Sequence, residues 1–150
     1  MNKHLTLILL TTVLAFTACK EDTSADWKIM NDNWMNIHKN DSGFVTSVSG
    51  LIYKNDSAGW TLNPKPNKDN FVNITYTGKL VDGYIFDSGT ANLSVSQTVT
   101  GFQEGLKMMH PGDNCTLYIP SALAYDTTST DSRIPANSIL IFDIKLNYVY

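Results

Sequence analysis

The sequence of 150 residues has no excess of basic residues, no internal repeat and no apolar run long enough to cross a membrane comfortably. Its 11 Lys and Arg are outnumbered by 14 Asp and Glu, and no basic stripe is present. Nucleic acid is therefore not expected as a partner, because a phosphate backbone is bound by clustered positive charge. The composition, 43% hydrophobic and 17% charged, is that of a globular domain.

Histidine and cysteine are scarce as well. His4, His38 and His110 are scattered, and no cluster has the spacing of metal ligands or of a Ser-His-Asp triad, so no metal or other cofactor is expected. Cys19 and Cys115 could form one disulfide in an exported protein. The N-terminal pattern gives Cys19 another use, so Cys115 is expected to be a lone, buried thiol.

The N-terminus has the layout of an export signal. Lys3 gives a positive start, and residues 5–18 form an almost uncharged, mostly apolar run. A membrane span needs about 20 apolar residues, so this run fits a signal peptide instead. Phe16-Thr17-Ala18-Cys19 resembles the lipobox of bacterial lipoproteins, although Leu is usual where Phe16 stands. The prediction is cleavage before Cys19 and lipidation of its thiol; the alternative is an ordinary signal with an accidental cysteine.

The lipobox resemblance implies an exported protein, lipid-anchored in the bacterial cell envelope, on the periplasmic or the surface side of the outer membrane. Lys20-Glu21-Asp22 follows at once, and acidic residues there resemble a surface-export signal of some lipoproteins. A solvated tether explains the same charges equally well. We therefore expect a signal peptide in residues 1–18, a tether with a short helical segment in 19–43, and a folded domain in 44–150.

The segment before the domain contains a helical pattern. Trp27, Met30, Trp34 and Ile37 recur at spacings of three and four, which places them on one side of a short helix. We expect this helix to pack on its own domain. A dimer contact or a docking site for a partner is the alternative.

From about residue 44 the pattern changes to the period of two that indicates strands. Strands are expected in residues 49–53, 72–76 and 115–119, and most clearly in 140–148. In the last strand alternate residues are apolar on one face: Leu140, Phe142, Ile144, Leu146 and Tyr148. Asp82-Gly83 is typical of a tight hairpin turn. The pattern predicts an antiparallel sheet with one face on a core.

One helix interrupts the strands. Thr100 and Gln103 have the spacing of a capping box, with Thr100 as the N-cap. Phe102, Leu106 and Met109 then fall on one side of the helix, and Pro111 with its following glycine ends it. A sheet folded around one short helix predicts an α+β fold, with the helix on one face.

Four blocks of this sequence resemble the signature motifs of the FKBP family. Residues 72–88 match Val-x-Val-x-Tyr-Thr-Gly, then Asp-Gly, then Phe-Asp-Ser, and residues 100–106 match the family helix Pro-Gly-Trp-x-Glu-Gly-Leu. Residues 119–125 match Ile-Pro-x-x-Leu-Ala-Tyr, and residues 133–142 contain the closing Ile-Pro and Leu-x-Phe. The resemblance covers roughly residues 44–150 and implies an FKBP-like curved antiparallel sheet wrapped around one short helix, with a short N-terminal helical extension.

The resemblance also implies an activity, peptidyl-prolyl cis-trans isomerisation, and a site for it. The site would be an apolar cleft between helix and sheet, with Phe102 as its floor and Asp87 at its rim. The Val99 N–H and the Tyr125 O–H would bind substrate carbonyls, and Thr98 would contact substrate. The implied walls are Tyr76, Phe86, Leu93, Val99, Tyr125, Ile134 and Phe142. Partners would be proline-containing polypeptide clients and macrolides such as tacrolimus and rapamycin.

Some positions depart from the family pattern. Phe102 stands for the usual Trp, Leu93 for a usual Phe, and Asp126 for the Gly after Leu-Ala-Tyr. The loop that follows Asp126 carries Asp131 and no glycine. These departures keep a second function open, a non-catalytic module or chaperone that binds proline-containing segments. A third is a structural envelope lipoprotein that uses the fold only as a scaffold.

Overall fold

The computed structural model describes residues 23–59, 61–128 and 132–150. The expected signal peptide, the lipidation site Cys19 and the acidic stretch after it lie outside the described residues, as does Asp131. Within the described part of the chain no helix is both long enough and apolar enough to span a membrane.

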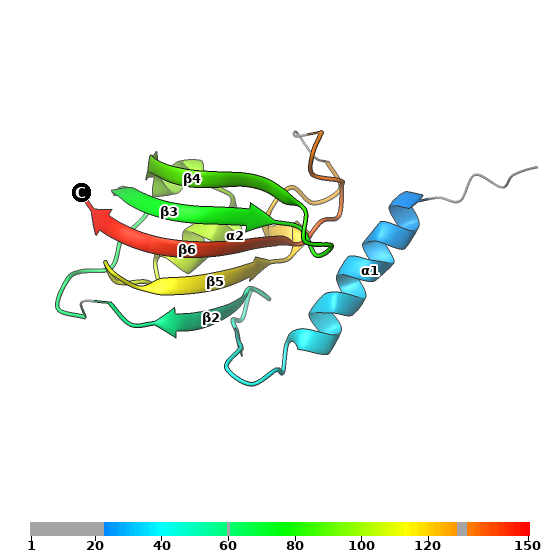
Figure 1. The fold of residues 1–150 in the computed structure, drawn as a ribbon, viewed down its shortest axis with the longest axis horizontal. Coiled ribbons are helices and arrows are strands. Elements are labelled where there is room, and N and C mark those ends of the chain that lie inside the picture. Colours follow the sequence, from blue (N-terminus) through cyan, green and yellow to red (C-terminus); the bar gives the residue numbers. More distant parts are fainter. Residues whose placement is uncertain (1–22, 60, 129–131) are drawn as a thin grey trace, which may run out of the picture.

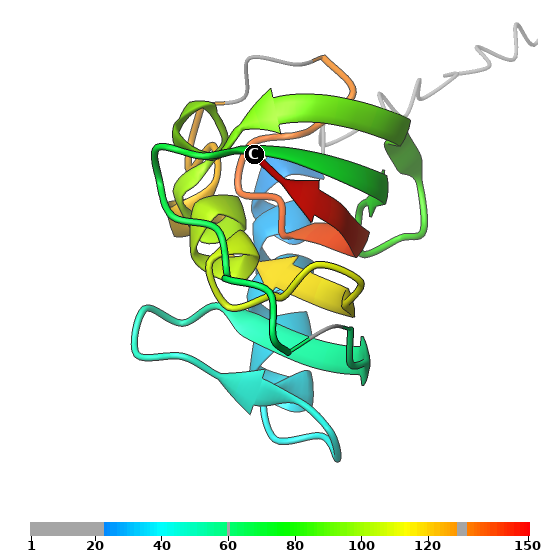
Figure 2. The same ribbon diagram turned by 90° about the vertical axis from the view of Figure 1, so that its left-hand side faces the viewer.

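The described residues form one antiparallel sheet, with a short helix against one face and a longer N-terminal helix beside one end of the strands (Figures 1 and 2). Within these residues the sheet has six strands in the order β1-β2-β5-β6-β3-β4. The strands are β1 (Val45–Thr46), β2 (Ile52–Ser57), β3 (Phe71–Lys79), β4 (Ile85–Ser94), β5 (Asn114–Ile119) and β6 (Leu140–Val149). The helices are α1 (Thr23–His38), α2 (Thr100–Leu106) and the 3-10 turns η1 (Val95–Gln97) and η2 (Ser121–Leu123). The α+β prediction is confirmed.

The alternation predicted for the last strand is confirmed along most of β6. Leu140, Ile144 and Leu146 are buried on the side of the sheet that faces α2. Tyr148 was expected on the same face, but it is exposed. The pairing with β3 shifts near Asn147, so that Val149 packs against the core in its place. An extra residue in one strand reverses the faces beyond it.

The first predicted strand is displaced along the chain. Residues 49–51 belong to a turn, because Ser47 N–H donates to Leu51 C=O and Gly50 N–H donates to Ser47 C=O. Gly50 has a φ of 94°, a conformation that glycine adopts readily. The strand β2 therefore begins at Ile52 and continues to Ser57.

The helix α2 lies against the concave side of the sheet, and its predicted apolar side is buried. Phe102, Leu106 and Met109 are all at most 5% exposed. The predicted helix end at Pro111 is wrong, because α2 ends at Leu106 and Met109 lies beyond it. The helix approaches β5 closely at Gly105, where an added Cβ would lie 2.2 Å from a methyl group of Leu117. The lack of a side chain at Gly105 is what permits this distance.

The predicted capping box of α2 is wrong. Val99 occupies the N-cap position, without a side-chain hydrogen bond to the helix, and Thr100 is the first helical residue. Gln103 Nε2 instead donates to the carbonyl of Thr98, at 2.7 Å, and more distantly to that of Ser96. Gln103 therefore ties the helix to the preceding turn η1.

The helix α1 packs on its own domain, as expected, through a different face. Trp27 Nε1 donates to Ser138 Oγ (2.9 Å), and the Trp34 ring stacks on Tyr118 with 5.0 Å between centroids. Asn31 lies between them, 1% exposed, and its Oδ1 accepts from the N–H of Ile139 (2.7 Å).

Two residues of the predicted apolar side, Met30 and Ile37, are exposed by 41% and 69%. The side of α1 that packs on the domain instead consists of Trp27, Asn31 and Trp34. The amide of Asn31 is buried there because the backbone N–H of Ile139 requires an acceptor.

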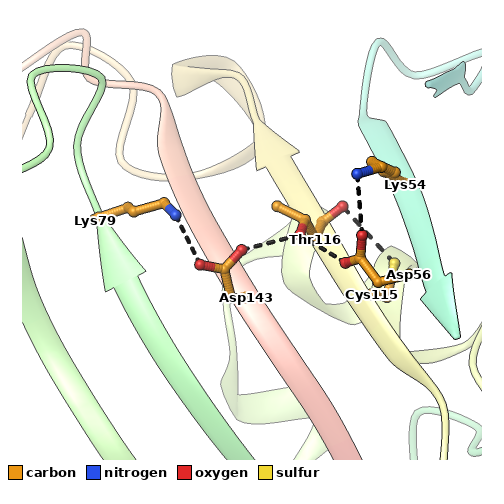
Figure 3. A network of polar contacts seen from close by, with 6 residues as sticks. All are labelled: Lys54, Asp56, Lys79, Cys115, Thr116 and Asp143. Atoms are coloured by element: carbon orange, nitrogen blue, oxygen red, sulfur yellow. Dashed lines mark hydrogen bonds and ion pairs between the residues drawn. The ribbon is translucent and has the colours of Figure 1, made fainter. Parts of the chain in front are cut away.

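The convex side of the sheet carries a polar network (Figure 3). Thr116 Oγ1 lies 2.9 Å from Asp56 Oδ2 and 2.9 Å from Asp143 Oδ1. Lys79 Nζ pairs with Asp143 (2.7 Å), and Lys54 Nζ pairs with Asp56 (3.3 Å). Each carboxylate is therefore paired with one lysine. The Thr116 hydroxyl lies between the two carboxylates and has one proton to donate to either of them.

Cys115 lies beside this network and points into the core. It is a free thiol, 2% exposed, so the prediction of a lone buried thiol is confirmed. Burial, followed by the negative charge of Asp56, raises the pKa of Cys115 to about 12. The thiol therefore stays protonated and behaves as a small hydrophobic side chain.

Candidate active site

A cleft of about 340 Å³ opens between α2, η1 and the concave face of the sheet. Its lining comes from β3, β4, α2, β6 and the segments around η1 and η2. The residues are Ile74, Tyr76, Leu93, Gln97, Thr98, Val99, Phe102, Tyr125, Leu140 and Phe142. A concave, mostly apolar site with a few polar groups is the usual form of a small-ligand pocket.

Aromatic rings surround Phe142 in this cleft. The Phe142 ring lies 4.8 Å from Phe102, 5.5 Å from Phe86 and 6.3 Å from Tyr76, measured between centroids. The first two pairs are edge-to-face, a favourable arrangement for aromatic quadrupoles. Phe102 reaches the cluster from the helix, so the floor of the cleft is fixed by packing.

A bulge in β4 turns two consecutive side chains toward this cluster. Gly78 pairs with Asp87 and Lys79 pairs with Ile85, so Phe86 is the extra residue. The Phe86 ring contacts Phe142, while the Asp87 carboxylate accepts a hydrogen bond from Tyr76. Bulges are a common means of re-aiming side chains at sites of function.

Gly78 makes the space that these rings occupy. A Cβ at this position would lie 2.7 Å from the Phe86 ring and 2.8 Å from the Phe142 ring. Any other residue at position 78 would displace at least one of the two aromatic side chains.

The Tyr76 hydroxyl is engaged by the protein. It donates to Asp87 Oδ2 at 2.8 Å. Partial burial, together with the hydrogen bond to Asp87 and its charge, raises the pKa of Tyr76 above its usual value. Tyr76 therefore stays protonated near neutral pH, and its ring is held in one orientation at the edge of the cleft.

Other donors at the cleft are unpaired, among them one backbone group and one hydroxyl. The backbone N–H of Val99 and the hydroxyl of Tyr125 have no hydrogen-bond partner within residues 23–59, 61–128 and 132–150. Both residues line the cleft, so a carbonyl-bearing ligand could accept from them. The Val99 carbonyl accepts from Phe102 and Gln103, which holds the Val99 peptide on the first turn of α2.

Most of the residues expected at the site are brought together. Tyr76, Leu93, Thr98, Val99, Phe102, Tyr125 and Phe142 all line the cleft. Asp87 is exposed beside it and binds Tyr76. Phe86 and Ile134 were expected as walls, but both lie in the buried core, 6% and 4% exposed, and neither lines the cleft. The Phe86 ring supports the lining from behind through its edge-to-face contact with Phe142.

Sequence reasoning missed three lining residues. Ile74 and Leu140 each precede a predicted site residue by two positions on the same strand, so the period of two could have identified them. Gln97 lies in η1, where no periodicity gives a signal.

Asp126 takes a left-handed backbone conformation that glycine adopts readily. Its φ is 52°, in the left-handed region that Asp tolerates better than most residues. Its N–H donates to Ser121 C=O, and its own carbonyl accepts from Asn137 N–H. The loop after Tyr125 therefore turns as a glycine would allow, at some cost in strain.

No group of three or more His, Cys, Asp or Glu side chains is placed to hold a metal ion in the part of the chain that the structure describes. The chemistry available in the cleft is apolar contact, aromatic faces and hydrogen bonding by the Val99 N–H, the Tyr125 O–H and the side-chain amide of Gln97.

A curved antiparallel sheet over one short helix, with an aromatic cleft between them, defines a protein of the FKBP fold. Residues 63–147 match the family model described as FKBP-type peptidyl-prolyl cis-trans isomerase. This chain belongs to the FKBP-type peptidyl-prolyl cis-trans isomerase family.

Relatives and a solved structure agree with this assignment. A probable FKBP-type isomerase FkpA of Neisseria meningitidis is 39% identical over 69% of this chain and 39% of its own length. The outer membrane protein MIP of Legionella longbeachae is 37% identical over 79% of this chain and 52% of its own. The crystal structure of FkpA from Escherichia coli has a TM-score of 0.79 at 30% identity, covering 86% of this chain and 62% of that one. The chain thus spans about half or less of the length of these two curated relatives.

Proposed function

We propose that this protein accelerates cis-trans rotation about X-Pro bonds in exported polypeptides, and so acts as a folding catalyst. The observation that carries the proposal is the aromatic cleft with two unpaired donors, the Val99 N–H and the Tyr125 O–H. Membership of the isomerase family and the names of the relatives support it.

The chemistry follows from the electronics of the amide. Uncatalysed X-Pro rotation takes tens to hundreds of seconds, because it breaks amide resonance. The planar amide is more polar than the twisted transition state, so a water-poor aromatic cleft favours the twisted form. Rotation breaks no covalent bond, so neither a nucleophile nor a metal is needed.

In this proposal the proline ring lies on Phe102, between Tyr76 and Phe142. The Val99 N–H and the Tyr125 O–H donate to carbonyls of the bound peptide and hold it while the bond rotates. Asp87 acts through Tyr76, since it fixes the orientation of that ring. Phe86 and Ile134 support the walls, and Thr98 with Leu93 contacts the flanking residues of the substrate.

The test measures cis-to-trans relaxation of a short X-Pro peptide with the full chain and with Tyr125→Phe. Removing one hydrogen bond to the substrate should lower kcat/KM about 3- to 10-fold. Tyr84→Phe is the matched control, because Tyr84 is exposed in the hairpin after β3 and should leave the rate unchanged. No acceleration by the parent protein would refute the proposal.

Leu93 favours the second candidate, a module that binds proline-containing segments without rapid catalysis. It lines the cleft where the family usually has Phe, which makes one wall less aromatic. Binding of the same peptide, without any acceleration, would support this function. Inhibition or displacement by tacrolimus or rapamycin would test the macrolide site, and no effect of either would indicate a remodelled cleft.

We also propose that residues 1–18 are a lipoprotein signal, that 19–43 form a tether with a short helical segment, and that lipidated Cys19 anchors the protein in the cell envelope. The lipobox-like sequence supports this, as does a relative named as an outer membrane protein. Cys19→Ala should abolish labelling by a radioactive fatty acid and release the protein from membranes, whereas Cys115→Ala should change neither. Persistent labelling of Cys19→Ala would refute the anchor.

A further inference from the structure

The strand β4 forms one border of the sheet, beside the cleft. Among the residues that the structure describes it pairs only with β3, and Figure 1 shows it as the upper border of the sheet. Its 10 residues, Ile85–Ser94, include no Lys, Arg or Pro. Proteins commonly protect long edge strands with such residues, because an edge presents unpaired N–H and C=O groups. Beyond the bulge at Phe86 and the charged Asp87 at its start, this edge lacks that protection.

The hydrogen-bond pattern identifies which groups point outward. Phe71 and Tyr150 exchange both backbone hydrogen bonds, so the N–H and C=O of Phe71 face β6. Along a strand, the backbone groups of successive residues point to opposite neighbouring strands. The backbone N–H and C=O groups that face β4 are therefore those of Val72, Ile74, Tyr76 and Gly78. Their partners Leu93, Ala91, Gly89 and Asp87 face back toward β3. The intervening residues of β4, which are Ser88, Thr90 and Asn92, therefore direct their backbone groups away from the sheet.

Two hydrogen bonds agree with this assignment and occupy part of the outward-facing backbone of β4. Arg133 donates to the outward carbonyl of Phe86, and the Asp87 carboxylate accepts from the outward N–H of Ser88. Within the described ranges no hydrogen bond reaches the backbone N–H or C=O of Thr90 or Asn92. The open part of the edge is therefore the stretch from the Ser88 carbonyl to Asn92.

The same strand borders the cleft. The row of β4 side chains that faces the concave side begins with Asp87 and ends with Leu93. Asp87 binds Tyr76, and Leu93 lines the cleft. Between them the row contains only Gly89 and Ala91, which face Tyr76 and Ile74 across the pair. Small residues make this wall low, so a polypeptide can leave the cleft along β4.

We propose that a client polypeptide whose proline occupies the cleft adds its flanking segment to β4 as an extended strand, paired with Ser88, Thr90 and Asn92. An added strand lies about 4.8 Å from β4 and directs alternate side chains to the concave side. Proline has no N–H and cannot itself pair, so the pairing falls on its neighbours. The inference rests on the proposed function for its choice of client, and it assigns the binding mode outside the cleft.

The first experiment uses ten-residue peptides with one central Pro, each N-methylated at a single flanking residue, and measures their affinity for the full chain. Strand pairing predicts an effect with a period of two. Methylation of an N–H directed at the edge should weaken binding about 3- to 10-fold, and methylation of its neighbour less than 2-fold. A flat profile would overturn the proposal.

The second experiment compares Thr90→Pro with Thr90→Ala. Thr90→Pro removes an N–H that β3 does not use, whereas Thr90→Ala keeps it and removes only the side chain. Thr90→Pro should reduce kcat/KM about 3- to 10-fold for an unfolded protein client and leave a tetrapeptide unaffected. Thr90→Ala should match the parent with both. Should Thr90→Pro fail to fold by circular dichroism, the methylation series decides alone.

The outcomes separate this inference from the isomerase proposal. A period-two methylation profile without any acceleration of rotation supports the edge and refutes the catalyst. Acceleration with a flat profile supports the catalyst and refutes the edge. A concentration-dependent dimer that Thr90→Pro abolishes would show that the edge pairs with a second copy, which also overturns the proposal.

Discussion

The two faces of this sheet are built from the same strands but treat their polar groups differently. On the convex face Thr116, Asp143 and Lys79 satisfy one another. On the concave face the donors of Val99 and Tyr125 have no partner among the described residues, although both lie against apolar surface. Donors that the protein leaves unpaired in an open cleft can bind the acceptors of a ligand in exchange for water. The comparison therefore indicates the concave face as the place where a ligand supplies the missing acceptors.

The largest expected difference between the faces is in stability. Leu117 and Thr116 are adjacent in β5 and point to opposite sides, and Leu117 is fully buried against α2. Leu117→Ala should lower the free energy of unfolding by about 2–5 kcal/mol, because it leaves a cavity in the core. Urea denaturation measures this. A loss below about 1 kcal/mol would mean that the concave core is loosely packed.

The next difference is in activity. Tyr76→Phe removes the hydrogen bond to Asp87, so the ring loses its anchor at the cleft, and kcat/KM should fall about 2- to 10-fold. Tyr148→Phe is the matched control, because Tyr148 is exposed and lies outside the cleft. Peptide isomerisation assays compare the two. Equal rates in both variants would show that the hydrogen bond between Tyr76 and Asp87 is not needed for activity.

A smaller effect is expected on the convex face. Thr116→Val keeps the shape of the side chain but removes the hydroxyl between Asp56 and Asp143. Stability should fall by about 1 kcal/mol, while isomerase activity stays within about twofold. Denaturation and kinetics on the same sample test this. A large loss of activity would show that the two faces are coupled.

The smallest effect is on the pH dependence of stability. The Cys115 pKa is about 12 in the folded protein, against 9.0 for an ordinary thiol. Below pH 9 the thiol keeps its proton in both the folded and the unfolded protein, so it does not affect how stability changes with pH. Above pH 9 the unfolded thiol loses its proton first, so stability falls as pH rises toward 12.

At pH 9.5 the loss should be less than about 1 kcal/mol. The parent and Cys115→Val should therefore diverge between pH 8 and 9.5 in urea denaturation curves. Parallel curves would indicate that Cys115 is accessible to water.

Regular elements with a strong period could be predicted from the sequence. The alternation in β6 and the apolar side of α2 fixed the core side chains Leu140, Leu146 and Leu106 correctly. The site residues in the cleft followed from the family motifs, since rings from β3, α2 and β6 meet only in three dimensions. Predictions failed where a single residue changes the pattern, as at the β6 bulge that exposes Tyr148.

The remaining errors arise from tertiary contacts that no local pattern contains. Apolar spacing selected Met30 and Ile37 for the buried side of α1, but the backbone of Ile139 needed an acceptor and Asn31 supplied it. The bulge at Phe86 turned its ring behind the lining instead of into it.

The attachment of α1 has a consequence for the order of assembly. Trp27 and Asn31 bind Ser138 and Ile139, which follow them by 111 and 108 residues. A polypeptide that emerges N-terminus first, from a ribosome or through a translocation pore, displays this amphipathic segment long before its docking partners exist. Docking of α1 must therefore wait until Ser138 and Ile139 have emerged, and until then the segment is available to chaperones.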